Sequence, residues 1–207
     1  MYLSKLTLDP RHPQARRDLG DPYEMHRTLV RAFVAGEETK PNRFLWRLER
    51  RADYQPSSIV LVQSARPGNW SVVEGLAGYA ADIQGNKAVA LEKLVQPSAR
   101  YRFRLLANPT VTRAGKRYGL LREEEQLAWL DRQGERCGFA IHGCIRGAGE
   151  RLQVRQSGKG HRITVDTALY EGILSAQNAD RLRQGILGGL GHGKAFGLGM
   201  LSLARIA

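Results

Sequence analysis

The chain has 207 residues, 42% hydrophobic and 25% charged, so it can bury the core of one large or two small domains, and these values argue against long disorder. Its 32 Lys and Arg residues outnumber 20 Asp and Glu, and the net charge of +12 predicts a polyanionic partner. Most of the cations are Arg, which grips phosphate bidentately, so nucleic acid is the favoured polyanion, although a GC-rich genome would also enrich Arg.

Cysteines and apolar runs exclude several other classes of protein. Cys137 and Cys144 form no disulfide framework and no CxxC zinc motif, so both are expected to be reduced. The N-terminus lacks the apolar core of a signal peptide, and no apolar run approaches the roughly 20 residues of a membrane span. We therefore expect a cytoplasmic protein that does not enter a membrane.

The first half of the chain predicts alternating strands and helices. We expect a strand at Tyr2–Leu8, a helix from Asp21 to about Gly36, and strands at Arg43–Glu49 and Ser58–Gln63. Residues 72–94 are ambiguous and fit a short helix and a strand.

The second half repeats this order. In its first strand, Tyr101, Phe103 and Leu105 alternate with arginines. The expected strands are 100–105, 139–145, 152–154, 163–173 and 200–203, and the expected helices are 123–133, with Leu127 and Leu130 facing inward, and 178–186.

Each half thus approximates the order β-α-β-β-α-β, which is the split βαβ or ferredoxin-like arrangement. The predicted fold class is α+β with two tandem ferredoxin-like (RRM-like) domains. A turn signal at Gln96-Pro97-Ser98 places the first domain at residues 1–95 and the second at residues 96–207.

The helix that begins at Asp21 has the best-defined start in the chain. Asp21 is a favourable N-cap, Pro22 fits the first helical position, and Glu24 can fold back onto the cap. At about 100° per residue, the helix has an apolar face and a polar face. The apolar face holds Met25, Leu29, Ala32 and Phe33, and the polar face holds Tyr23, His26, Arg27 and Arg31.

The polar face of this helix suits RNA cleavage by transesterification. In that reaction a ribose 2′-OH attacks the adjacent phosphate and a 5′-OH leaves. His26 can transfer protons, Tyr23 can donate a hydrogen bond or share that duty, and Arg can neutralise phosphate oxygens, with no metal ion. The free N–H groups at the helix start also attract phosphate. A surface histidine without a role is equally compatible with the pattern alone.

The C-terminal glycine run comes close to a nucleotide-binding loop. Gly188, Gly193 and Lys194 have the spacing of G-x-x-x-x-G-K, but Ala195 stands where Ser or Thr holds magnesium. Only 12 residues follow Ala195, too few to complete a nucleotide domain, so we expect no nucleotide cofactor. Gly191, Gly193 and Lys194 are instead candidates for contact with an RNA phosphate, and a tight connection is the structural alternative.

A second basic segment, residues 146–161, interleaves glycines with cations and predicts a hairpin with flexible tips. Its candidates for phosphate contact are Arg151, Arg155, Lys159 and, just beyond, Arg162. A solvated surface loop is the alternative.

Six blocks of sequence, in order along nearly the whole chain, carry a family resemblance. They are MYLSKL (1–6), DPYEMH (21–26), YRFRLLANP (101–109), EQLAWL (125–130), YEGIL (170–174) and GHGKAFGLGMLSL (191–203). Together they resemble the CasE-type CRISPR repeat endoribonucleases, which are Cascade subunits of type I-E systems.

The resemblance implies two ferredoxin-like domains and cleavage of a repeat hairpin at the 3′ base of its stem, leaving a 2′,3′-cyclic phosphate, with no metal or cofactor. It places the catalytic histidine on His26 and the assisting tyrosine on Tyr23. Arg31 stands where some relatives carry Lys. The arginine keeps the positive charge, but it is not expected to transfer a proton. It also implies that the glycine run holds RNA and that the basic hairpin enters the major groove of the stem. The implied partners are precursor and mature crRNA and the other Cascade subunits.

The kind of RNA bound follows from what the sequence lacks. Neither half carries the aromatic RNP pattern that stacks single-stranded bases, which favours binding to a stem by charge and shape. Two alternatives stay open: a subunit that holds the hairpin without cutting it, and an architectural role in docking other subunits. A toxin-like ribonuclease or a DNA-binding regulator is a more distant interpretation.

Overall fold

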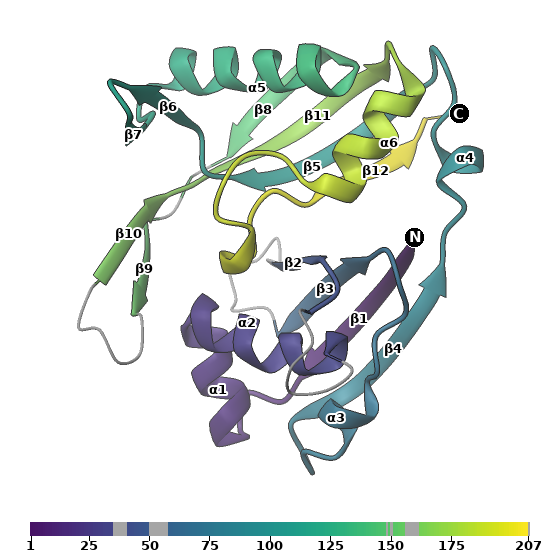
Figure 1. The fold of residues 1–207 in the computed structure, drawn as a ribbon, viewed down its shortest axis with the longest axis vertical. Helices are drawn as coiled ribbons and strands as arrows, with labels where there is room; N and C mark the ends of the chain where they lie inside the picture. Colours follow the sequence, from purple (N-terminus) through teal and green to yellow (C-terminus); the bar gives the residue numbers. More distant parts are fainter. Residues whose placement is uncertain (35–40, 50–57, 148, 150, 156–161, 207) are drawn as a thin grey trace. The chain divides into compact units, whose positions relative to one another are not determined.

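In the computed structural model the chain forms two compact units (Figure 1). The structure describes residues 1–34, 41–49, 58–147, 149, 151–155 and 162–206. Unit 1 comprises Met1–Val89, Val154–Arg162 and Ala195–Gly197, and unit 2 comprises Ala90–Gln153, Ile163–Lys194 and Leu198–Ala207. The domain ranges 1–95 and 96–207 stay a prediction.

Unit 1 is built on a four-stranded sheet of order β2-β3-β1-β4 in which every pairing is antiparallel. Helices follow β1 and β3, which is the ferredoxin-like order. Its elements are β1 Tyr2–Leu8, α1 Pro13–Gly20, α2 Pro22–Val30, the 3₁₀ helix η1 Arg31–Phe33, β2 Phe44–Leu48, β3 Ile59–Ser64, α3 Ser71–Glu74 and β4 Ala80–Ala88.

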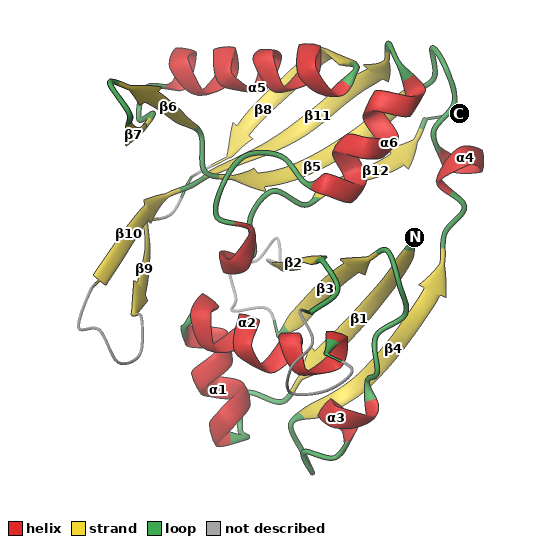
Figure 2. Ribbon diagram, in the orientation of Figure 1, coloured by secondary structure: helices red, strands yellow, loops and turns green. Residues whose placement is uncertain are grey.

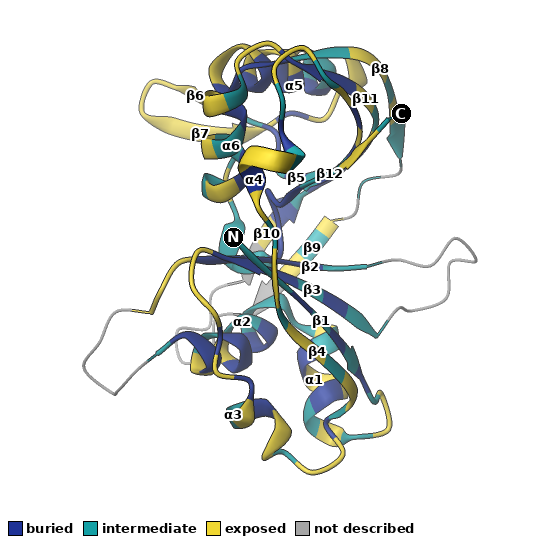
Figure 3. Cartoon of the chain, turned by 90° about the vertical axis from the view of Figure 1, so that its right-hand side faces the viewer, coloured by how far each residue is buried: buried dark blue, intermediate teal, exposed yellow. Residues whose placement is uncertain are grey.

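The core of unit 1 lies between this sheet and its helices (Figure 3). Alternate residues of β1 point inward, so Leu6 and Leu8 are buried, and Val60 and Val62 of β3 join them. Met25 and Leu29 of α2 complete the contact at 1% exposure each. The predicted apolar face of the helix is therefore the buried one, and the opposite face is left for function.

Unit 2 repeats the topology with a sheet of order β12-β5-β11-β8 (Figure 2). Its elements are α4 Leu91–Leu94, β5 Arg100–Ala107, β6 Thr110–Arg113, β7 Lys116–Gly119, α5 Glu123–Cys137, β8 Phe139–Gly147, β9 Arg151–Arg155, β10 Arg162–Asp166, β11 Ala168–Ala176, α6 Ala179–Gly188, the 3₁₀ helix η2 Lys194–Phe196 and β12 Leu201–Arg205. Of these, parts of η2, β9 and β10 are grouped with unit 1. The predicted α+β class with two ferredoxin-like folds is confirmed. None of the described helices is long and apolar enough to cross a membrane.

One helix was not predicted, and two helix predictions were wrong in part. The helix α1 was not predicted, because its buried residues are only Ala15 and the polar Asp18, which leaves no apolar period to read. The helix that follows ends at Val30 as an α-helix and at Phe33 as a 3₁₀ helix, while residues 35–40, where the prediction ended, lie outside the described residues. In α5, Leu130 is buried as predicted, but Leu127 is only half-buried, because it lies at the edge of a buried face that runs through Gln126, Trp129, Leu130 and Gln133.

One strand prediction was wrong in part, and one hairpin was not predicted. The expected strand at 163–173 is two strands, β10 and β11, separated at Thr167. The hairpin β6–β7 was not predicted, because its strands are short and largely exposed. Its turn, Ala114-Gly115, has φ angles of 47° and 74°, the two positive values that a type I′ hairpin turn requires.

Candidate active site and RNA-binding residues

The start of α2 is fixed by its N-cap. Oδ1 of Asp21 accepts a hydrogen bond from the Tyr23 N–H at 2.9 Å, and Pro22 occupies the first helical position, both as predicted. The predicted fold-back of Glu24 onto the cap is wrong. The Asp21 N–H that Glu24 would accept from donates instead to the Arg17 carbonyl at 3.0 Å, a bond that closes the last turn of α1. A carboxylate thus already engages the first N–H of α2, which disfavours a phosphate at this helix end.

His26 lies one turn after Tyr23 on the same face of α2, and both side chains are half-buried. The imidazole stacks on Phe44 of β2, with ring centroids 5.2 Å apart and planes inclined by 23°. Its Nδ1 is buried and has no hydrogen-bond partner among the described residues. Proton exchange with a ligand is therefore left to Nε2.

The protonation of His26 follows from that setting. Burial lowers the pKa of its imidazole below the ordinary value of 6.5, because burial disfavours the charged form. At neutral pH the ring is therefore mainly neutral, the state in which a histidine can accept a proton.

A buried polar network holds α2 in place from α1. The carboxylate of Asp18 accepts hydrogen bonds from Thr28 Oγ1 at 2.6 Å and from the Tyr79 hydroxyl at 2.8 Å, and it pairs with Arg17 at 3.0 Å. Burial, and next the charge of Asp18, raises the pKa of Tyr79 far above its ordinary range. Because Thr28 belongs to α2, this network ties the helix that carries His26 to α1 and to the chain before β4.

The two arginines of the polar face differ in their partners. Arg27 is exposed and its Nη1 pairs with Glu24 Oε1 at 3.0 Å, one turn back on the helix. Arg31 begins η1, is exposed, and has no ion pair within the part of the chain that the structure describes. Arg31 is therefore the more available of the two for a phosphate.

The glycine run is shaped by its backbone. Gly191, Gly193 and Gly199 adopt φ angles of 73°, 83° and 85°, which favour glycine. The Leu190 N–H donates to the Gly199 carbonyl at 2.8 Å and closes the loop. Lys194 Nζ donates to the Gly191 carbonyl at 2.9 Å, so this lysine braces the loop from within. These contacts favour the structural alternative and leave phosphate contact as a prediction.

The basic hairpin is described in part. Arg151 begins β9 and its Nε pairs with Asp166 Oδ1 at 2.9 Å. Arg155 lies in β9 and Arg162 in β10, but their side chains lie outside the description, and Lys159 lies outside the described residues altogether.

Sequence reasoning missed two residues that shape this site, Asp18 and Phe44. A buried aspartate in a short helix gives no sequence signal of its own. Phe44 lies in a predicted strand, but Phe44, Leu45, Trp46 and Arg47 are all buried, so alternation does not tell which side chain turns toward His26.

Comparisons with known proteins agree over the full length of the chain. The model of a family described as CRISPR associated protein matches residues 1–205. The CRISPR-associated endoribonuclease Cse3 of Thermus thermophilus is 38% identical over 99% of this chain and 100% of its own, and the Cascade subunit CasE of Escherichia coli is 29% identical over 100% of both. A structure of Cse3 bound to 19 nt RNA superposes with a TM-score of 0.88 at 38% identity, covering 99% of this chain and 100% of that one.

Proposed function

The chain belongs to the family of CRISPR-associated proteins as an endoribonuclease of the CasE type, and we propose that it cuts precursor CRISPR RNA at the 3′ base of the repeat hairpin by attack of a ribose 2′-OH, without a metal ion. The bond from the 2′-oxygen to phosphorus forms as the bond to the 5′-oxygen breaks. The products are a 2′,3′-cyclic phosphate and a free 5′-OH.

His26 carries this proposal. The reaction needs a group that accepts the 2′-OH proton, and a mainly neutral imidazole with an available Nε2 meets that need at neutral pH. Tyr23, one turn away, is the group we assign to hydrogen-bond the reacting phosphate or to share proton transfer with His26. The departing 5′-oxygen takes its proton from the His26 imidazolium that has formed, or from Tyr23 where the two groups share the transfer.

Cations supply the remaining chemistry. Charge builds up on the phosphorane oxygens in the transition state, and the helical period predicts Arg27 and Arg31 on the polar face with His26. We further propose that Arg151, Arg155, Lys159 and Arg162 bind the stem, and that Gly191, Gly193 and Lys194 contact its backbone.

The relatives suggest what happens to the product. A structure of Cse3 represents a pre-cleavage RNA complex, and the E. coli relative is a Cascade subunit. We propose that this protein likewise keeps its mature crRNA and joins a Cascade complex in the cytoplasm, where repeat transcripts are made. We keep residues 1–95 as the domain that bears the catalytic helix and residues 96–207 as the second domain.

The test is single-turnover cleavage of the cognate repeat RNA in excess EDTA. We expect the wild-type protein to yield a shorter RNA with a cyclic-phosphate end, and His26→Ala to bind the RNA but to cut about 100- to 10,000-fold more slowly. Loss of wild-type cleavage in EDTA would contradict metal independence. Binding without cleavage by the wild type would favour the non-catalytic, RNA-holding subunit.

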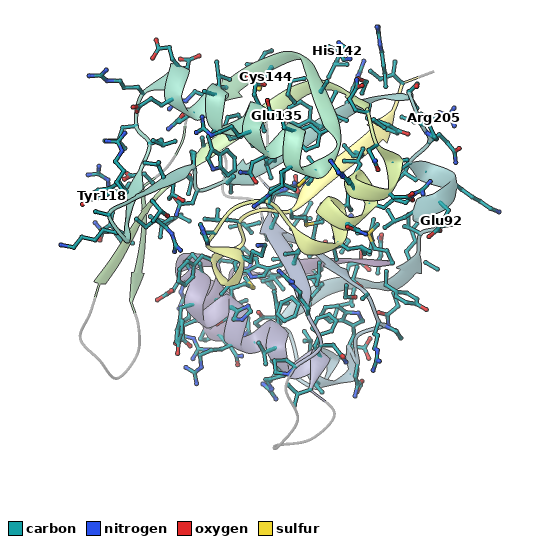
Figure 4. All side chains as sticks on the ribbon, turned by 45° about the horizontal axis from the view of Figure 1, so that its top comes forward. Glu92, Tyr118, Glu135, His142, Cys144 and Arg205 are labelled. Carbon is teal, nitrogen blue, oxygen red and sulfur yellow. The ribbon has the colours of Figure 1, made fainter. Side chains whose placement is uncertain are left out.

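His142→Ala is the matched control. His142 is an exposed histidine on β8 of unit 2 (Figure 4), and its Nε2 lies 2.7 Å from Ser175 Oγ. We expect this variant to cut at the wild-type rate. A loss of cleavage that is seen in His26→Ala but not in His142→Ala would then be specific to the site on α2.

A further inference from the structure

The imidazole of His26 lacks the support that proton-transferring histidines usually have. In those sites a hydrogen bond to the second ring nitrogen fixes the tautomer and the direction of the ring. Within the described part of this chain, the buried Nδ1 of His26 has no such partner. The ring contact that the structure does provide is the stack on Phe44 at 5.2 Å.

Phe44 is itself held by a column of aromatic rings. Phe33 of η1 stacks on it with centroids 4.5 Å apart and planes inclined by 16°, and Trp70 meets Phe33 edge-on at 5.7 Å and 87°. All three rings are buried. Because a close-packed ring cannot tilt without opening a cavity, the column holds the plane of Phe44 firmly.

The far end of the column is anchored by Asn86 of β4. Its Oδ1 accepts hydrogen bonds from Trp70 Nε1 at 3.3 Å and from the Gly68 N–H at 2.8 Å. Gly68 and Gly85 leave room for the rings, because a Cβ at Gly68 would lie 3.1 Å from Phe33 and one at Gly85 would lie 2.6 Å from Trp70. The column is therefore a built feature of unit 1, with contributions from β2, η1, β4 and the loop before α3.

We propose that Phe44 is a positioning residue for RNA cleavage, and that its ring orients the His26 imidazole by stacking where a hydrogen bond at Nδ1 would otherwise do so. This inference rests on the proposed role of His26. The stack fixes the plane of the imidazole and with it the direction of Nε2, the nitrogen that meets the RNA.

Charged neighbours do not take over this task. The charged residues on the elements that hold the ring are Glu24 and Arg27 of α2, Arg31 of η1, Arg47 of β2 and Arg43 just before β2. Burial is the one cause that lowers the pKa of His26. Loss of the Phe44 ring would admit water, so the pKa of His26 should then rise toward its ordinary value.

The test is Phe44→Leu in the full chain, which keeps an apolar side chain but removes the flat ring. We expect single-turnover cleavage of repeat RNA to slow by about 10- to 100-fold, since a small misplacement of a reacting group costs that much. RNA affinity should stay within about twofold, because the lost contact acts on the reaction step. The midpoint of the His26 Cε1–H titration, followed by NMR, should move to higher pH in Phe44→Leu. The variant Phe44→Tyr, which keeps the flat ring, should retain most of the wild-type cleavage rate.

Phe103→Leu is the matched control, the same exchange at a buried phenylalanine of β5 in unit 2. We expect it to lower stability and to leave the cleavage rate of the folded protein unchanged. If Phe44→Leu behaves in the same way, or leaves the His26 titration unmoved, while His26→Ala is inactive, the role of Phe44 is overturned and the proposed function stands. A fully active His26→Ala overturns the proposed role of His26, and this inference with it.

Discussion

The two units place their candidate RNA-binding segments by different physical means. In unit 1, α2 is held by side chains: the Asp18 network on one side and the Phe44 stack on the other. In unit 2, the glycine run is held by its own backbone, with left-handed glycines and the bond from the Leu190 N–H to the Gly199 carbonyl. Side-chain support can tune the protonation of a nearby group, whereas backbone support sets only a shape. The difference therefore favours a role in the cleavage reaction for unit 1 and a role in RNA binding for unit 2.

Removal of the side-chain support should have the largest effect. Asp18→Ala leaves the buried hydroxyls of Thr28 and Tyr79 without their acceptor, so we expect the free energy of unfolding to fall by about 3–5 kcal/mol. Urea unfolding measures the loss, and hydrogen exchange should rise in peptides of α1 and α2.

Asp180→Ala in α6 is the control in unit 2, because Asp180 is exposed and, among the described residues, forms an ion pair with Arg183 alone. Its unfolding free energy should change by less than about 0.5 kcal/mol. Equal losses in the two variants would show that the Asp18 network does not support α2.

The backbone support of unit 2 should break at Gly199. Its φ is 85°, and an added Cβ would collide with the Leu190 carbonyl oxygen, so Gly199→Ala should cost about 1–3 kcal/mol of unfolding free energy. Gly188→Ala is the control, since Gly188 ends α6 with nothing within 4 Å of the added Cβ. The control should be neutral or stabilise by up to about 1 kcal/mol in the same urea assay. If Gly188→Ala were destabilised and Gly199→Ala were not, the proposal that backbone conformation holds the glycine run would be contradicted.

The sequence could predict the parts of this molecule that follow an apolar period. The ends of β1, the start of α2 at Asp21 and the inward side of α2 depend on local pattern and capping, and all three predictions are confirmed. Tyr23, His26, Arg27 and Arg31 were placed on the polar face by the same period. Their roles stay predictions, because geometry alone assigns no reaction.

What the sequence could not predict depends on contacts between distant segments. Asp18 meets Tyr79 across 61 positions of the chain, and Phe44 reaches His26 from a strand whose consecutive residues are all buried. The fold-back of Glu24 was wrong for a similar reason, since Asp21 is also the C-cap of the unpredicted α1, which uses the Asp21 N–H. Short exposed strands such as β6 and β7 carry no apolar period at all.

The charges on the polar face should show a smaller effect, on binding. Arg31→Ala should lower the slope of log affinity against log salt by about 1 between about 50 and 200 mM, if Arg31 neutralises one phosphate. Arg27→Ala should change the slope less, because Glu24 already offsets its charge. A filter-binding titration with repeat RNA measures both slopes. A larger change for Arg27 than for Arg31 would reverse the proposed ranking.

The smallest expected effect is on the pH dependence of the unfolding free energy, to which one histidine in each unit contributes. The pKa of His26 is lowered by burial, and that of His192 by burial and then by the charges of Arg117, Lys194 and Arg136. For each histidine, the folded pKa is lower than the unfolded pKa of about 6.5, so the unfolded chain binds more protons between the two values. The stability linked to the neutral ring is therefore fully present above the unfolded pKa and is lost as the pH falls toward the folded pKa. Urea midpoints at about pH 7.5 and 5.5 should therefore differ less in His26→Gln and in His192→Gln than in the wild type.

Salt then separates the two histidines. The cations around the exposed His192 are screened by salt, whereas the burial of His26 is not. Added salt should shrink the contribution of His192 to the pH dependence and leave that of His26 unchanged. If salt removes both contributions, the pKa of His26 is set by charge rather than by burial. The side-chain account of unit 1 would then need a charged group in place of the Phe44 ring.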